Sequence, residues 1–238
     1  MLSKKPWRAE VVLLFCAAQA FFLFFGMTIA GLLQKWGVAG FKSPSDFGNP
    51  LVATLSFQGA TWILIPVFLA LHGVKFRDAF GLKKQSPWVV SLLVLGVVVL
   101  ALIVAAVLEP ASRAVLQKLG WKAHPEEAVA LVTGAKAFWM RLYLDFFAVV
   151  LAPVAEEFIF RGVLYPVIKQ LGYPRLALFG VSALFALIHL DAAIALPLFV
   201  LALGLTWLYE RTDTLLAPIA AHGLFNAANL VLLAYFSK

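Results

Sequence analysis

Charged residues are scarce in this sequence. Of its 238 residues, 13% are Asp, Glu, Lys or Arg, whereas 63% are hydrophobic. A soluble domain has about 25% charged residues, so the composition excludes a soluble globular protein and predicts one embedded in a lipid bilayer. Cysteine is scarcer still. The single Cys16 excludes an intramolecular disulfide and a cysteine-based metal site.

Long uncharged hydrophobic runs, by contrast, are abundant. Residues 11–33 and 88–108 carry no charged side chain, and each run exceeds the roughly 20 residues that a helix needs to cross a bilayer. Strands of membrane β-barrels are only about 10 residues long and alternate in polarity, so these runs exclude a barrel. The predicted fold class is all-α, a polytopic helical membrane protein with about seven transmembrane helices. The expected spans are 11–33, 51–71, 88–108, 138–171 (bent near Pro153 and Pro166), 176–190, 193–209 and 215–236.

No internal repeat or low-complexity tract divides the chain, so a single transmembrane domain over residues 1–238 is expected. Residues 1–137 would hold the N-terminal helices and a polar interlude, and residues 138–238 a helical core that carries the chemistry. The interlude runs from Glu109 to Lys136 and leaves two interpretations open. Its part from Ala111 to Trp121 lies along the membrane surface as an amphipathic helix, or it is a solvated loop.

The net charge of +7 would suggest nucleic acid as a partner of a soluble chain. Here most Lys and Arg residues lie between hydrophobic runs, where they act as topology signals, so no nucleic-acid partner is expected. The N-terminus, with Lys4, Lys5 and Arg8, is predicted to share the cytoplasmic side with the basic linker from His72 to Pro87. The first hydrophobic run is longer than that of a signal peptide, which indicates a retained signal anchor.

The stretch from Ala155 to Arg161 places three ionisable side chains inside a helix that otherwise suits lipid. A charge at this depth costs about 2.5–3.5 kcal/mol, so such groups face a protein interior or a wet cavity. Glu157 and Arg161 stand four positions apart on one helix face and are expected to form a structural salt bridge. Glu156 points about 100° away and is left without that partner.

Three further polar residues fall at the depth of Glu156. A turn at residues 172–175 makes its two flanking helices antiparallel, and His189 is then about as far from the turn as Glu156 is. On the last helix, His222 and Asn226 are four positions apart and project from one face. Each residue taken alone is also explained as an interhelical hydrogen bond. The shared depth of the four favours a functional site.

A carboxylate beside an imidazole and an amide suits the activation of water. Glu156 would act as general base, and His189 would hold the water and later protonate the leaving amine. His222 and Asn226 would donate hydrogen bonds to the oxyanion that develops at an attacked carbonyl. A nucleophilic serine such as Ser182 fits less well. Zinc bound by Glu156, His189 and His222 stays open, although the sequence has no H-E-x-x-H pattern.

Three patterns follow one another on successive helices: Glu156-Glu157-x-x-x-Arg161, Phe185-x-x-x-His189 and His222-x-x-x-Asn226. Together they resemble the CAAX prenyl protease and bacteriocin-processing family of intramembrane proteases, also called the Abi or Rce1-like group. The resemblance covers residues 138–238. The helices before it are similar to the family only in being hydrophobic.

The resemblance implies a membrane-embedded, glutamate-dependent and metal-independent endopeptidase with no cofactor, whose chamber opens toward the cytosol. It assigns the residues as follows: water activation to Glu156 and His189, the oxyanion site to His222 and Asn226, and support of the helix to Glu157 and Arg161. The substrate would be a peptide or membrane-associated protein in the lipid bilayer, prenylated for eukaryotic relatives and more varied for prokaryotic ones. The short loops look prokaryotic, which predicts a multi-pass protein of the inner cell membrane.

An alternative from a different class is a non-catalytic membrane adaptor, immunity factor or small transporter that uses the same polar cluster to bind a peptide or an ion. The absence of a recognisable substrate-binding domain motivates it. A transporter of this kind would show paired broken helices or repeats, and the sequence shows neither clearly.

Overall fold

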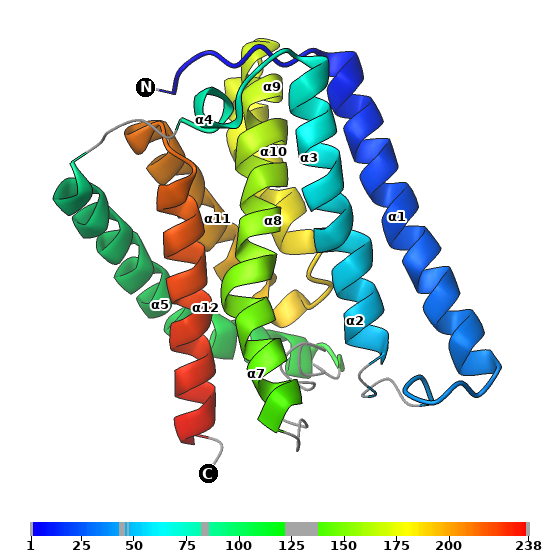
Figure 1. Ribbon diagram of the computed structural model, residues 1–238. Helices are drawn as coiled ribbons and strands as arrows, with labels where there is room; N and C mark the ends of the chain where they lie inside the picture. The colour runs from blue at the N-terminus through cyan, green and yellow to red at the C-terminus, as the bar shows by residue number, and fades with distance from the viewer. Residues whose placement is uncertain (1, 43–45, 47, 82–85, 122–137, 237–238) are drawn as a thin grey trace.

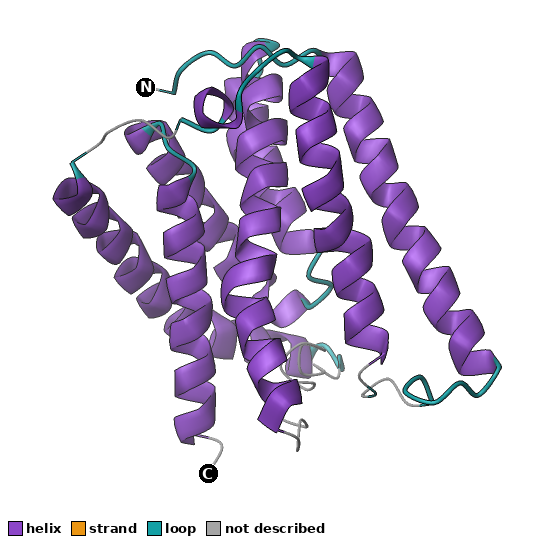
Figure 2. Cartoon of the chain, in the orientation of Figure 1, coloured by secondary structure: helices purple, strands orange, loops and turns teal. Residues whose placement is uncertain are grey.

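The computed structural model describes residues 2–42, 46, 48–81, 86–121 and 138–236, and within them every regular element is a helix (Figures 1 and 2). The elements are α1 (Ala9–Lys35), α2 (Gly48–Thr54), η1 (Leu55–Gly59), α3 (Ala60–Leu71), α4 (Phe76–Ala79), α5 (Pro87–Lys118), α7 (Phe138–Phe146), η2 (Phe147–Leu151), α8 (Ala152–Glu157), η3 (Phe158–Leu164), α9 (Tyr165–Gln170), α10 (Pro174–Leu187), α11 (Ala192–Thr212) and α12 (Leu216–Phe236). The η elements are π-helical. The predicted all-α fold class is confirmed.

Five helices of the described chain are long and apolar enough to cross a membrane, so the protein is a multi-pass membrane protein. They are Ala9–Lys35, Gly48–Leu71, Pro87–Lys118, Ala192–Thr212 and Leu216–Leu233. The predicted count of seven is not confirmed. The 14 residues of α10 give a length of about 21 Å, which is less than the thickness of a hydrocarbon core.

The helices run between two ends of one bundle (Figure 1). At one end lie the N-terminal segment and the C-terminal ends of α3, α9 and α11. Helix α11 packs against α5 and α10, and α1 packs against α3. Each residue of the stretch Phe158–Val163 is buried. Many large hydrophobic side chains are exposed on the outside of the bundle.

A continuous helical run from Phe138 to Gln170, here called the motif helix, confirms the expected fourth helix. Its irregularities lie just before its two prolines: η2 ends two residues before Pro153, and η3 ends two residues before Pro166. Proline has no N–H and its ring clashes with the carbonyl four positions earlier. The helix accommodates each proline with a local π-helical register, a feature often found at functional sites.

Two expected boundaries were wrong. Helix α10 ends at Leu187 rather than at residue 190, because Leu190 adopts a positive φ of 55° and the side chain of Asp191 then caps α11 by accepting the N–H of Ala193. The span expected at 88–108 continues as one helix, α5, to Lys118. Most of Ala111–Trp121, for which a surface helix and a solvated loop were both left open, is therefore part of this same helix. The rest of the polar interlude, from residue 122, lies outside the described residues.

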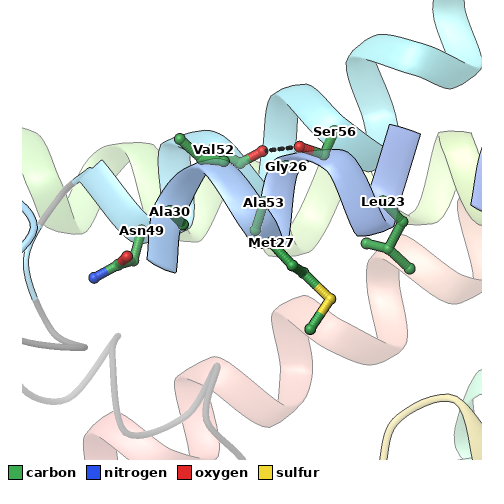
Figure 3. Close-up of a pocket in the computed structure, with 8 residues that line it drawn as sticks. All are labelled: Leu23, Gly26, Met27, Ala30, Asn49, Val52, Ala53 and Ser56. Carbon is green, nitrogen blue, oxygen red and sulfur yellow. Dashed lines mark hydrogen bonds between the residues drawn. The ribbon is translucent and has the colours of Figure 1, made fainter. Parts of the chain in front are cut away.

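One described cavity lies between α1 and the run of α2 and η1 (Figure 3). Its volume is about 140 Å³. The helices cross closely beside it, since a Cβ added to Gly26 would lie 1.7 Å from Ser56 Oγ. The lining residues are Leu23, Gly26, Met27, Ala30, Asn49, Val52, Ala53 and Ser56. This cavity contains none of the residues that the sequence predicted as a site.

Candidate active site

Glu157 and Arg161 form the expected salt bridge, with Arg161 Nη1 2.8 Å from Glu157 Oε1. Both side chains are fully buried. The guanidinium also donates through Nη2 to the carbonyl of Ala202 at 3.0 Å, and it lies over the ring of Phe185 at 4.7 Å from the centroid. A buried charge needs such partners because desolvation alone costs several kcal/mol per ion. The pair is therefore firmly fixed inside the bundle.

His222 joins this pair from α12. Its Nδ1 lies 3.1 Å from Glu157 Oε1, and the imidazole is 3% exposed. A carboxylate can only accept, so Nδ1 carries a proton and donates to Glu157. The other ring nitrogen, Nε2, is thereby turned toward Glu156, at 3.9 Å from Glu156 Oε2. Glu157 thus fixes both the orientation and the Nδ1 proton of His222.

Glu156 differs from its neighbour in having almost no polar partners. Its side chain is 13% exposed. Its Oε2 atom is buried and accepts no hydrogen bond from the described residues. Consecutive helix positions explain the contrast, since the two carboxylates point about 100° apart. Glu157 Oε1 is bonded to Arg161 and His222, whereas Glu156 Oε2 lies 3.9 Å from Nε2 of His222.

His189 lies in the turn after α10 and is partly buried. Its Nδ1 lies 2.8 Å from the carbonyl oxygen of Phe185. A carbonyl accepts, so Nδ1 donates and Nε2 carries a lone pair in the neutral ring. The fully buried ring of Phe185 connects the two imidazoles, with centroid distances of 5.0 Å to His189 and 5.5 Å to His222.

Asn226 lies one turn after His222 and contacts the motif helix at the Pro153 irregularity. Its Nδ2 donates to the carbonyl of Ala148 at 2.8 Å. In a π register that carbonyl would accept the N–H five positions later, which is Pro153 and has none. The carboxamide of Asn226 therefore supplies a donor that the helix lacks. One N–H of the amide remains beyond this bond.

A glycine allows α12 to approach this point. A Cβ added to Gly223 would lie 2.6 Å from the backbone oxygen of Val149. Only glycine permits such contact between the two backbones. Because Gly223 follows His222 directly, the same contact sets the position of that imidazole along the motif helix.

The structure brings Glu156, Glu157, Arg161 and His222 into one cluster. His189 reaches this cluster through Phe185 rather than by a hydrogen bond to Glu156. The sequence reasoning missed the bond between His222 and Glu157, and it read prolines only as bends. A signal was available: a proline inside a helix frees a carbonyl, which indicates a donor on a neighbouring element.

Within the described ranges, no three His, Cys, Asp or Glu side chains are grouped so that they could hold a metal ion. The zinc site left open by the sequence, on Glu156, His189 and His222, is not such a group. Metal independence itself remains a prediction.

Fold and site together define a multi-pass helical membrane protein with a buried cluster of two carboxylates, a guanidinium and an imidazole. Residues 137–228 match the family model described as Type II CAAX prenyl endopeptidase Rce1-like. This match agrees with the resemblance drawn from the three motifs, over a stretch that makes up less than half of the chain. Neither the curated proteins nor the solved structures include a match to the chain.

Proposed function

We propose that this protein is a glutamate-dependent intramembrane endopeptidase in which Glu156 activates the hydrolytic water. One observation carries the proposal: Glu156 presents a buried oxygen, Oε2, without a hydrogen-bond partner among the described residues, while Glu157 beside it is held through Oε1 by Arg161 and His222, although its own Oε2 is also unpartnered. An unpartnered buried carboxylate is costly. A general base must keep its lone pairs available for the proton that it removes.

The charges of the cluster support a donor role for His222. Glu157 and Arg161 cancel each other. Nδ1 of His222 donates to Glu157 Oε1, and its Nε2 is turned toward Glu156 at 3.9 Å. A donor role requires a proton on Nε2 as well, with which His222 keeps its bond to Glu157 and can donate from Nε2 to an oxyanion.

Asn226 is proposed as the second donor to the oxyanion. Its bond to the carbonyl of Ala148 fixes the carboxamide, so the remaining N–H is held in one direction before the reaction begins. A donor positioned in this way needs no reorganisation when charge develops, and each such donor contributes about 2.7–4 kcal/mol elsewhere.

The reaction then proceeds in two steps. Glu156 takes a proton from water as the water oxygen attacks the carbonyl carbon, and the carbonyl oxygen becomes an oxyanion held by His222 and Asn226. The C–N bond breaks as the amine leaves with the proton that Glu156 took from water, passed on directly or through the Nε2 lone pair of His189, so that both residues return to their starting states. Water has then supplied the hydroxyl of the new carboxylic acid and a proton of the new amine.

The substrate class proposed is a peptide segment of a membrane-associated protein, prenylated or not, reached from the cytosolic side without a metal or cofactor. One transmembrane domain over residues 1–238 would carry the activity, with residues 138–238 as its catalytic core. Lys4, Arg8 and Arg77 lie toward the end of the bundle that bears the N-terminus, which supports a cytoplasmic N-terminus in a bacterial inner membrane.

Cleavage in proteoliposomes tests the proposal. A fluorogenic peptide ending in a farnesylated CAAX sequence and the same peptide without the farnesyl group are offered to wild-type protein and to Glu156→Gln. We expect a loss of about 10³-fold in the variant, which keeps the shape of the side chain but removes the base. The matched control is Glu109→Gln, which changes a half-exposed carboxylate on α5 and should leave cleavage unchanged.

Two results would contradict the proposal. Undiminished cleavage by Glu156→Gln would remove the base from the mechanism, and a chelator that abolishes cleavage, with zinc restoring it, would replace the metal-free reaction. Comparison of membrane proteomes from wild-type cells and cells carrying Glu156→Ala then identifies the substrate. Its precursor should accumulate only in the variant.

A further inference from the structure

The segment before α1 lies against the end of the bundle and is bonded to three of its helices. Figure 1 shows it in blue, passing over the ends of the helices before α1 begins. The N–H and Oγ of Ser3 donate to Asp213 Oδ1 at 3.0 and 2.9 Å, at the end of α11. The N–H of Lys5 donates to Gln170 Oε1 at 2.8 Å, at the end of α9. The N–H of Arg8 donates to Nε2 of His72 at 3.0 Å, beyond α3.

Trp7 is a buried aromatic residue of this segment. It is 8% exposed and its ring contacts Phe68 and His72 edge-on, at centroid distances of 4.9 and 5.1 Å. The indole Nε1–H donates to the carbonyl of Gly162 at 2.9 Å, in a buried hydrogen bond across 155 residues of sequence. The N-terminal segment therefore reaches η3 directly.

The carbonyl of Gly162 is one that the helix itself leaves without its α-helical donor. In an α-helical register it would accept the N–H of residue 166, which is Pro166 and has none, and in the π register of η3 the backbone donor would be Val167 instead. The indole N–H of Trp7 is a donor to this carbonyl from another part of the chain, as the amide of Asn226 is to the carbonyl of Ala148.

Gly162 is joined covalently to Arg161. A shift of its peptide group moves the guanidinium, which holds Glu157, and Glu157 in turn holds Nδ1 of His222 at 3.1 Å. The ring of Phe80 closes the opposite face, since a Cβ on Gly162 would lie 2.6 Å from it. The peptide of Gly162 is held between this ring and the indole of Trp7.

We propose that Trp7 is a positioning residue of the active site. Its indole N–H holds the carbonyl of Gly162, just before Pro166, and so sets Arg161, Glu157 and, through them, the imidazole of His222. This inference rests on the proposed function for its effect on cleavage. Trp7 lies outside the 137–228 stretch that matches the family model.

Trp7→Phe separates the hydrogen bond from packing, because the ring stays against Phe68 while the N–H is lost. We expect kcat to fall by about 10- to 100-fold with KM little changed, as for other small displacements of catalytic groups. Pro166→Ala restores a backbone N–H to the helix, and the double variant with Trp7→Phe should recover most of kcat. Trp36→Phe is the matched control, since Trp36 is 68% exposed.

A second readout does not depend on cleavage. Hydrogen exchange of backbone amides over residues 158–164 should accelerate in Trp7→Phe and return toward the wild-type rate in the double variant. Unchanged exchange and kcat in Trp7→Phe, or no recovery with Pro166→Ala, would overturn the inference. If exchange responds as expected while wild-type protein cleaves neither peptide, the helix role of Trp7 stands and the proposed function fails.

Discussion

Near each of its two prolines, the motif helix accepts a hydrogen bond from another part of the chain. Near Pro153 the donor is Asn226, which comes from α12 and belongs to a recognisable motif. Near Pro166 the donor is Trp7, which comes from the N-terminal segment and belongs to none. Each turn is also closed by a glycine, with Gly223 against backbone at the first and Gly162 against a ring at the second.

The difference shows what each turn holds in place. At the Pro153 turn, the neutral carboxamide of Asn226 donates a hydrogen bond that brings α12, with His222, against the motif helix. The Pro166 turn lies beside the buried ion pair of Glu157 and Arg161. A substitution that disrupts the first turn should shift α12. A substitution that disrupts the second should leave a buried charge of the Glu157–Arg161 pair without its partner, which costs more free energy of folding.

The largest effect is therefore expected at the charged turn. Arg161→Met removes one partner of a fully buried pair and should lower the free energy of unfolding by about 3–5 kcal/mol. Denaturant titration in detergent micelles measures this. Arg113→Met, on the half-exposed pair with Glu109, is the control and should change stability by less than about 1 kcal/mol. Equal effects of the two variants would show that burial is not what distinguishes the pairs.

Gly223→Ala should cause the next largest loss of stability. Its Cβ would lie 2.6 Å from the backbone oxygen of Val149, whereas the Cβ of Gly162→Ala meets the ring of Phe80 at the same distance. A ring can turn and a backbone carbonyl cannot, so Gly223→Ala should be the more harmful, with a loss of about 3 kcal/mol. Thermal unfolding of both variants decides the order. The reverse order would mean that α12 moves more freely than Phe80.

Asn226→Leu should show a smaller loss of stability and a large loss of rate. The carbonyl of Ala148 loses its donor, which destabilises by about 1–3 kcal/mol, and cleavage loses an oxyanion contact worth about 10²–10³ in kcat. Adding Pro153→Ala restores a backbone N–H and should recover the stability but not the rate. Recovery of both would assign Asn226 a structural role alone.

Gly96→Ala gives the smallest expected effect, with the opposite sign. This glycine lies in α5, and an added Cβ meets nothing within 4 Å. Alanine should stabilise the helix by about 0.5–1 kcal/mol, because glycine loses more backbone entropy on folding. A higher unfolding temperature with unchanged cleavage is expected. A destabilised Gly96→Ala would show that α5 has a close neighbour in the membrane.

Much of the fold could be predicted from the sequence because its causes are local. Hydropathy over about 20 residues sets a span, and the four-residue spacing of Glu157 and Arg161 alone places them on one helix face. Boundaries were harder. The positive φ of Leu190 ends α10 early, and α5 continues past Pro110 to Lys118, neither of which a hydrophobic pattern reports.

The sequence by itself determined that the protein lies in a membrane, that it is helical, and that one glutamate of the motif pairs with an arginine while the other does not. Only the tertiary structure decided that His222 contacts Glu157 and faces Glu156, that His189 reaches the cluster through Phe185, and that Trp7 and Asn226 bond to the motif helix. The physical reason is that periodicity fixes directions within one helix. The rotation and depth of one helix against another are set by packing between residues far apart in the chain, such as Gly223 on Val149.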